Sequence, residues 1–417
     1  MSLSSAMYSG VSGLLSFGNA MNVTGDNIAN VNTVGFKGNR TIFADILANS
    51  VANGSTTMQF GRGAAIKGVQ ASFAQGAFET TGNATDMAIQ GAGFFVVRDA
   101  TNGGNYYTRA GQFIISDKGK LVNPSGFIVQ GYALSTDSAG NTTKSGAASD
   151  IDITGVQSVP KATTTFRLGI NLNSAASAAT TFSSSFNAYN ALGETVTVTY
   201  TFTKNLAPAQ SWHYVASGPA GTTLSGAGLS GTMTFSSTGV MTLPAADQPL
   251  TISGFPSGSA PLTINWELYN PVTGVSHGDI TGYAAGSVTN TMVQDGYTTG
   301  VLRGLSVDDT GIISGLFSNG QTQKLRQVEL ADFLSPWGLS RQGNSMFAET
   351  SQSGQPIMGT AKAGGFGTIY GSSLELSSVD LSQQFVNMIQ DQRAYQANSK
   401  IITTVDTMLQ EVVSLVR

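Results

Sequence analysis

The residue types that most often do chemistry are scarce in this chain. It has no cysteine, which excludes thiol catalysis, and only two histidines in 417 residues. His213 stands between Trp212 and Tyr214 in a segment of strand character, and His277 stands in a Ser/Gly turn. A His-rich metal site or a histidine general base needs partners that this pattern does not provide. We therefore expect no catalytic residue, no metal site and no cofactor.

Two short motifs resemble catalytic or nucleotide-binding sequences. Asp309-Thr-Gly311 matches the core of aspartic proteases, but those enzymes need two such carboxylates and the sequence has one copy, so we interpret it as a β-turn. Gly91-Ala-Gly93 starts like a dinucleotide motif but leads into Phe94-Phe-Val-Val, a strand pattern where a helix is required. A carboxylate pair for glycoside hydrolysis stays open, because it needs only proximity in the fold.

Both ends of the chain carry apolar residues at helical spacing. Such a stripe predicts a helix that docks on a partner, as in a coiled coil, and we expect terminal coiled-coil helices over residues 1–30 and 376–417. Polar Gln384, Asp391 and Asn398 at alternate seam positions would restrict the register. A hairpin or dimer would use the same stripe. The expected assembly residues are Leu3, Met7, Val11, Leu14, Met21, Ile28, Leu381, Phe385, Met388, Tyr395, Ile402, Val405, Leu409, Val412 and Val416.

The middle of the chain has strand patterns separated by Gly, Asn and Asp turns. Residues 31–75 are expected to form an extended connector. An inner β domain is predicted from residues 76–159 and 299–375, interrupted by an outer β-sandwich or barrel at residues 160–298. The clearest strand is Thr195–Phe202, where apolar residues alternate with threonine. The predicted fold class is mostly β with helical termini and two nested β domains, the inner one discontinuous in sequence.

The composition excludes several classes of partner. Charged residues make up 11% of the chain, which carries 51 glycines and a net charge of −4. Nucleic acid and anionic membranes attract basic surfaces, so neither is an expected partner. No window reaches the roughly eighteen apolar residues of a membrane span, so no membrane insertion is expected. The N-terminus also lacks the pattern of a cleaved signal peptide.

Three segments resemble bacterial flagellar rod and hook proteins. Asn27-Ile-Ala-Asn-Val-Asn-Thr-Val-Gly-Phe-Lys37 is similar to their shared signature, with Asn27, Asn30, Thr33, Gly35, Phe36 and Lys37 at the signature positions. Thr80–Phe95 and Tyr107–Phe113 resemble the core β domain of the family, and Val379–Asn398 resembles its C-terminal helix. The insertion of about 140 residues favours the hook branch over the rod branch.

This resemblance implies a structural subunit that is not an enzyme. It would polymerise with itself into the curved, flexible tube that transmits torque from rod to filament. Export through the flagellar secretion apparatus, without a cleaved signal peptide, would place it outside the cell in the flagellar hook. The implied partners are the distal rod protein, the hook cap protein and the hook-filament junction protein.

Two alternatives remain at this stage. The chain could be another axial flagellar protein, from the distal rod or the hook-filament junction. It could also be a secreted oligomeric β-rich binding module. Trp212, Trp266 and Trp337 discriminate between a binding module and a filament subunit, because a binding module would expose them and a filament subunit would bury them.

Overall fold

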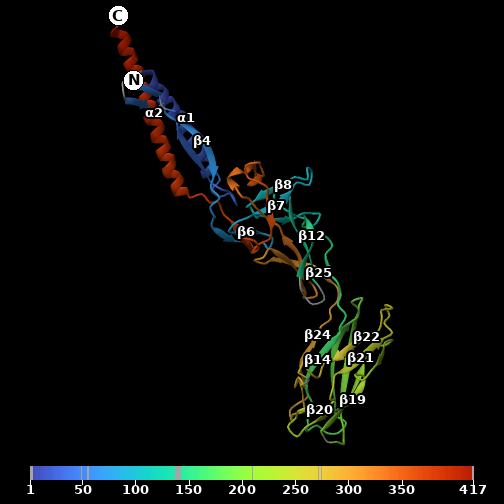
Figure 1. The fold of residues 1–417 in the computed structure, drawn as a ribbon. Coiled ribbons are helices and arrows are strands. Elements are labelled where there is room, and N and C mark those ends of the chain that lie inside the picture. Colours follow the sequence, from blue (N-terminus) through green and yellow to red (C-terminus); the bar gives the residue numbers. More distant parts are fainter. Residues whose placement is uncertain are drawn as a thin grey trace. The chain divides into compact units, whose positions relative to one another are not determined.

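Figure 1 shows the chain as a computed structural model, which describes residues 3–47, 49–53, 56–136, 142–208, 210–270, 272–273 and 275–415. The chain forms two compact units. The terminal unit contains Met1–Gly155, Gly304–Gly315 and Gln323–Arg417, and the middle unit contains Val156–Arg303 and Leu316–Thr322. The fold class is confirmed as mostly β with a helix at each end.

Each end of the chain is one long helix. Helix α1 (Leu3–Ala29) ends just before an Asn-rich turn, and α2 (Leu381–Leu415) begins after Asp380. The Asp380 carboxylate accepts hydrogen bonds from the backbone N–H groups of Ser382 and Gln383 at 2.8 and 3.1 Å, so it caps the first turn of α2. The two helices lie side by side (Figure 1).

The segment expected as an extended connector contains paired strands. Strand β1 (Asn39–Asp45) pairs antiparallel with β4 (Ala64–Ala71), and β2 (Asn49–Asn53) pairs with β3 (Thr56–Phe60). The β1–β4 ribbon packs on α1: the Phe17 and Phe43 rings lie 5.3 Å apart, and the Ser16 hydroxyl donates to the Ala64 carbonyl at 3.0 Å. Support from the helix explains why short apolar stretches between Gly and Asn residues form strands here, since an isolated two-stranded ribbon is marginal.

The β part of the terminal unit is built around one long sheet with the order β27-β11-β7-β8-β30-β29. Its core contains Met87, Phe95, Val129 and Leu330, all with no exposed surface. A short strand pair, β5 with β33, joins the segment after β4 to the segment before α2. The strands are β5 (Phe78–Thr80), β6 (Met87–Gln90), β7 (Phe94–Arg98), β8 (Asn105–Thr108), β9 (Ile114–Ile115), β10 (Leu121–Val122), β11 (Ile128–Thr136), β12 (Thr142–Asp150), β28 (Leu330–Asp332), β29 (Ser340–Gly343), β30 (Met346–Ala348), β31 (Ile357–Gly359), β32 (Thr368–Gly371) and β33 (Ser373–Glu375).

Three strands run through sequence shared by the two units, and the rest of the middle unit is a pair of sheets. The shared strands are β25 (Gly300–Val307), β26 (Ile312–Phe317) and β27 (Thr322–Val328). The strands of the middle unit are β13 (Gln157–Ser158), β14 (Thr165–Asn171), β15 (Thr181–Tyr189), β16 (Thr195–Lys204), β17 (Ser211–Ser217), β18 (Thr223–Ser225), β19 (Ser230–Phe235), β20 (Met241–Leu243), β21 (Gln248–Ser253), β22 (Leu262–Trp266), β23 (Ile280–Thr281) and β24 (Val288–Gln294).

The two sheets of the middle unit share one apolar core. One sheet has the order β18-β21-β22-β14-β23, with β24 also pairing with β14, and the other has the order β15-β16-β17-β19-β20. The alternation predicted for Thr195–Phe202 is confirmed, because Val196, Val198, Tyr200 and Phe202 on β16 are buried while the intervening threonines are not. Such alternation is what a strand with one face on a core requires.

Two motifs set aside in the sequence also have their expected structure. Asp308 to Ile312 forms a turn, in which the Gly311 N–H donates to the Asp308 carbonyl at 3.0 Å and Gly311 has φ +75°. Gly91-Ala-Gly93 leads into strand β7. Both interpretations are confirmed.

The three tryptophans do not share one environment. Trp212 and Trp266 are 1% and 0% exposed in the core of the middle unit, whereas Trp337 is 61% exposed. Trp337 lies in a short 3-10 turn, η1 (Pro336–Gly338), at the surface of the terminal unit. The expectation of burial for all three is therefore wrong for Trp337 in the single subunit.

Candidate assembly site

The two terminal helices meet along faces rich in small and polar residues. A Cβ at Gly13 would lie 2.5 Å from Asn398 Oδ1, and one at Gly10 would lie 3.1 Å from Ile402 Cγ1. Glycine at these two positions lets the backbone of α1 approach α2 closely. The α1 residues that this face buries are Gly10, Gly13, Ser16, Ala20, Thr24 and Asn27.

Polar contacts connect the helices at regular intervals. Asn27 Nδ2 donates to Gln384 Oε1 at 3.0 Å, and the Thr24 hydroxyl donates to Asp391 Oδ2 at 3.3 Å. With Asn398 against Gly13, these contacts recur every seven residues along α2, and a shift by one turn would break all three. The polar positions Gln384, Asp391 and Asn398 thus lie in the contact between the two helices of one chain.

Partial burial perturbs the acid in this contact. Desolvation raises the pKa of Asp391 above its usual value, and the hydrogen bond from Thr24 opposes that shift without cancelling it. The charged carboxylate is therefore held at some cost in this position.

The apolar stripe expected as the seam lies beside the polar contact rather than at its centre. Val405 is 5% exposed and completes the line of Gln384, Asp391 and Asn398. The other stripe residues are partly covered or exposed: Met7, Leu14, Met21, Ile28, Met388 and Ile402 are half-buried, and Val11, Leu381, Phe385, Tyr395, Leu409 and Val412 are exposed. The side chain of Leu3 and the whole of Val416 lie outside the described residues.

Further apolar residues that were not singled out in the sequence add to this exposed surface. Leu15 on α1 is 66% exposed, and Ile389 on α2 is 50% exposed. Hydrophobic periodicity could have found them, but the heptad reading assigned one stripe per helix and overlooked neighbouring faces. We call the exposed apolar residues of the two helices the open helix face; they are Tyr8, Val11, Leu15, Leu381, Phe385, Val386, Ile389, Tyr395, Ile401, Met408, Leu409, Val412 and Val413.

The signature segment joins α1 to the rest of the terminal unit. The Asn27 side chain accepts from the Asn39 N–H at 2.7 Å and donates to the Asn39 carbonyl at 2.7 Å, which ties the end of α1 to β1. Asn30 Nδ2 donates to Asp26 Oδ1 at 3.0 Å, and the Thr33 hydroxyl donates to Asn30 Oδ1 at 3.0 Å. These side-chain bonds satisfy the polar groups of the turn that ends the helix.

Gly35 is required by the backbone of this turn. It has φ +66°, and a Cβ there would lie 2.5 Å from the Ala110 backbone nitrogen. Its N–H donates to the Glu375 carbonyl at 2.8 Å. Both the left-handed conformation and the close approach exclude other residues.

Lys37 enters a buried ionic cluster. Its Nζ lies 2.6 Å from Glu375 Oε1, and neither side chain has any exposed surface. Glu375 Oε1 also accepts from the Gly76 N–H at 2.9 Å, Arg109 Nη1 lies 3.6 Å from Glu375 Oε2, and Lys37 Nζ donates to the Ala74 carbonyl at 2.8 Å. Burial lowers the pKa of Lys37 and of Arg109, while the Glu375 carboxylate opposes both shifts.

Arg109 and Glu375 were missed as site residues in the sequence. Glu375 follows an apolar residue in a short strand, and Arg109 lies in a segment that was noted only for its resemblance to the family β domain. A charged residue within an apolar segment is a weak signal of burial, and nothing local indicates that residues 37, 109 and 375 meet.

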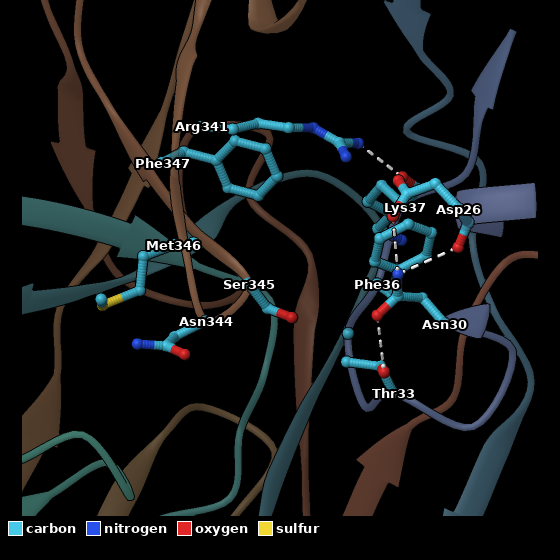
Figure 2. A pocket seen from close by; sticks show the side chains of 12 residues that line it. Asp26, Asn30, Thr33, Phe36, Lys37, Arg341, Asn344, Ser345, Met346 and Phe347 are labelled. Atoms are coloured by element: carbon cyan, nitrogen blue, oxygen red, sulfur yellow. Dashed lines mark hydrogen bonds between the residues drawn. The ribbon is translucent and has the colours of Figure 1, made fainter. Parts of the chain in front are cut away.

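A cavity of about 360 Å³ lies beside the signature segment. Figure 2 shows Phe36, Asp26, Asn30 and Thr33 on one side and the β29–β30 hairpin on the other. Arg341 Nη2 donates to the Lys37 carbonyl at 2.6 Å, which holds the two walls together. The guanidinium carbon of Arg341 lies 5.4 Å from the Phe36 ring centroid and 5.9 Å from that of Phe347.

No clustering of metal ligands accompanies these features. Within the described part of the chain, no three or more His, Cys, Asp or Glu residues come together as a metal site would require. The described helices also include none that is long and apolar enough to cross a membrane.

Four family models match the chain, and together they extend over most of it. The flagella basal body rod protein model matches residues 7–37, and the flagellar hook protein FlgE/F/G D1 domain model matches residues 88–175. The flagellar basal body protein FlaE D2 domain model matches residues 156–297, and the flagellar basal body rod FlgEFG protein C-terminal model matches residues 371–415.

Similar proteins match the chain from end to end. The flagellar hook protein FlgE of Borreliella burgdorferi is 32% identical over 98% of this chain and 99% of its own length. That of Salmonella typhimurium is 34% identical over 97% of this chain and 98% of its own length. The crystal structure of Helicobacter pylori flagellar hook protein FlgE2 aligns with 71% of this chain and 100% of its own, with a TM-score of 0.46 and 17% identity. On the full-length identities to hook proteins and the four family matches, this chain belongs to the flagellar hook protein family.

Proposed function

We propose that this structural subunit of the bacterial flagellar hook polymerises with itself through its terminal helices into a curved, flexible tube that transmits torque from rod to filament. One observation carries the role of the helices. Each helix uses its small and polar face inside the chain, and the open helix face stays uncovered in a single subunit. Full burial of one large apolar side chain contributes roughly 1.5–3 kcal/mol, so several half-exposed ones favour association strongly.

The symmetry of the subunit suits a filament. The open helix face lies on two different helices, so the surface that one copy offers need not be the surface that it contacts on the next copy. Contacts of this heterologous kind build helical filaments when the rotation does not close. The polar contacts at Gln384, Asp391 and Asn398 support one register within each subunit, which keeps the surface of every copy the same.

The remaining parts of the proposal rest on the family alone. They are export without a cleaved signal peptide, a location outside the cell in the hook, and end-to-end partners in the distal rod protein, the hook cap protein and the hook-filament junction protein. We also propose that the subunit has no catalytic activity, in keeping with the structural naming of its relatives.

A charged substitution on the open helix face tests the assembly surface. Phe385→Glu with Ile389→Glu places two carboxylates one turn apart, at residues that are 49% and 50% exposed in the single subunit. The matched control is Gln392→Glu with Gln396→Glu, which adds the same charge at the same spacing on exposed polar positions of α2. Circular dichroism of dilute protein should show that all variants keep their helices.

Electron microscopy of concentrated protein then gives the answer. We expect hollow tubes from the unmodified chain and the control, and dispersed subunits from the Phe385/Ile389 variant. Tubes from that variant at unchanged protein concentration would contradict the role of the open helix face. Dispersed subunits from the unmodified chain would instead favour a secreted oligomeric binding module, which the exposed Trp337 also suits.

A further inference from the structure

Trp337 is presented at the surface on a well-supported turn. It is 61% exposed, and its neighbour Leu334 is 89% exposed. The Thr350 hydroxyl donates to the Gly338 carbonyl at 2.6 Å, the Ser335 N–H donates to the Ser353 carbonyl at 3.4 Å, and a Cβ on Gly338 would lie 2.5 Å from the backbone of Gln352. A large aromatic side chain fixed in this way loses little freedom on binding, which is typical of an interface anchor.

The cavity beside the signature segment has the chemistry to receive an indole ring. Phe36 and Phe347 give it aromatic walls, and the Arg341 guanidinium that lies near both rings could also face an indole. Asp26 accepts from Asn30 at one carboxylate oxygen, and its other oxygen can accept from the indole N–H. A tryptophan combines an apolar body with one polar donor, which matches a cavity of apolar walls and one acidic rim residue.

Both features belong to the terminal unit, but Trp337 does not line the cavity of its own chain. Trp337 precedes β29, whereas the cavity is formed by β29, the following turn and β30 (Figure 2). A protrusion and a matching hollow on different parts of one subunit make a heterologous contact, which repeats from copy to copy instead of closing.

We propose that Trp337 of one subunit inserts into the cavity between the signature segment and the β29–β30 hairpin of a second copy of this chain. This contact adds a β-domain interface to the helix interface and rests on the proposed polymerisation. It also gives the signature residues a second role, because Phe36 then binds the neighbouring subunit in addition to supporting its own turn.

Tryptophan fluorescence tests the burial of Trp337 directly. Trp212 and Trp266 are already buried, so the signal that acrylamide quenches in the single subunit comes mainly from Trp337 and is identified by comparison with Trp337→Phe. We expect quenching of the Trp337 signal to fall at least threefold in tubes, and Trp337→Ala to raise the protein concentration needed for tubes about tenfold or more. Tubes in which Trp337 stays fully quenchable would overturn the proposal and leave this residue free for another ligand.

Cross-linking tests the position of Trp337 in the cavity, because the chain has no native cysteine. Asp26→Cys with Trp337→Cys should give a ladder of disulfide-linked oligomers when tubes are treated with an oxidant. Thr101→Cys with Trp337→Cys is the matched control, since Thr101 is an exposed residue of the same unit outside the cavity. All three positions are exposed, so the fold should tolerate the changes.

The outcomes separate this inference from the proposed function. A ladder from the Asp26 pair alone supports the inserted tryptophan. Tubes without a ladder, or equal ladders from both pairs, would reject it while leaving polymerisation intact. If no tubes form from the unmodified chain, polymerisation itself fails and the inference fails with it.

Discussion

At the scale of single residues, the buried cluster of Lys37, Glu375 and Arg109 connects three distant parts of the chain. Lys37 closes the signature segment, Glu375 ends the last strand before α2, and Arg109 follows β8. Two cations around one carboxylate leave a net positive charge, which burial makes costly unless every group keeps its partners. The cluster therefore couples the exits of both terminal helices to the β domain.

Removal of Lys37 should expose how much the terminal unit depends on this cluster. We expect Lys37→Met to destabilise the unit by about 3–5 kcal/mol, because the Glu375 carboxylate stays buried without its closest cation. Urea unfolding, combined with hydrogen exchange at the Gly35 and Gly76 amides, measures the effect and localises it.

Two controls make the result specific. Lys67→Met removes the same charge from an exposed position on β4 and should change stability by less than about 0.5 kcal/mol. Lys37→Met combined with Glu375→Gln should recover part of the loss, since no unpaired carboxylate remains. Equal effects of Lys37→Met and Lys67→Met would show that the ion pair contributes nothing beyond surface charge.

At the scale of elements, the helix pair shows how a polar line and an apolar stripe divide their tasks. The polar line of α2 faces α1 within the chain, and the apolar stripe remains for neighbours. Because polar contacts are weaker than apolar burial but more specific in geometry, this division supports a defined register inside the subunit and leaves the stronger association between subunits.

Asp391 makes the helix pair sensitive to pH. Its pKa is raised in the folded chain by burial, so the folded state binds a proton more readily than the unfolded chain does. The corresponding stability is fully present below the ordinary aspartate pKa and is lost as the pH rises through the raised pKa. We therefore expect the thermal midpoint of the helices, followed by circular dichroism, to fall over this mildly acidic range as the pH increases.

Asp391→Asn should remove this dependence and raise the helix midpoint at neutral pH. Asp406→Asn makes the same change at an exposed position of α2 and should leave the dependence in place. A pH profile that Asp391→Asn does not alter would show that another group is responsible.

At the scale of the whole molecule, the middle unit has a core of its own. The sheets that contain β16 and β22 bury Trp212 and Trp266 against residues of the same unit. The hairpin end at residues 316–322 belongs to this unit as well, and Asn319 Nδ2 donates to Ser158 Oγ at 3.0 Å and to the Thr298 carbonyl at 2.8 Å. The amide of Asn319 thus connects the segments where the chain enters and leaves the unit.

An isolated fragment of residues 156–303 should fold and bury both tryptophans, because its apolar core is complete. It should be less stable than the same unit in the full chain, since the hydrogen bonds of Asn319 are lost. Thermal unfolding followed by tryptophan fluorescence measures this difference. Asn319→Ala in the full chain should reproduce a loss of about 1–3 kcal/mol. A fragment without a cooperative transition would contradict the independence of the core.

Much of the architecture follows from local patterns. The terminal helices, the alternating strand at Thr195–Phe202, the turn at Asp309–Gly311 and the absence of cysteine chemistry were all readable in the sequence. The signature at Asn27–Lys37 also pointed to the family that the full-length comparisons show. The paired strands within residues 31–75 were not recognised, because their pattern is too irregular without the support of α1.

The sequence alone determined which segments are helical or extended, because periodicity of 3.6 or 2 is a property of consecutive residues. Only the tertiary structure decided which face of each helix meets the other, which tryptophan stays exposed, and which charges are buried together. Asn27 and Gln384, like Lys37 and Glu375, are more than 300 residues apart, and no local pattern specifies such a contact. Their pairing depends on the packing of the whole terminal unit, where the free energy of burial is shared among segments that the sequence keeps far apart.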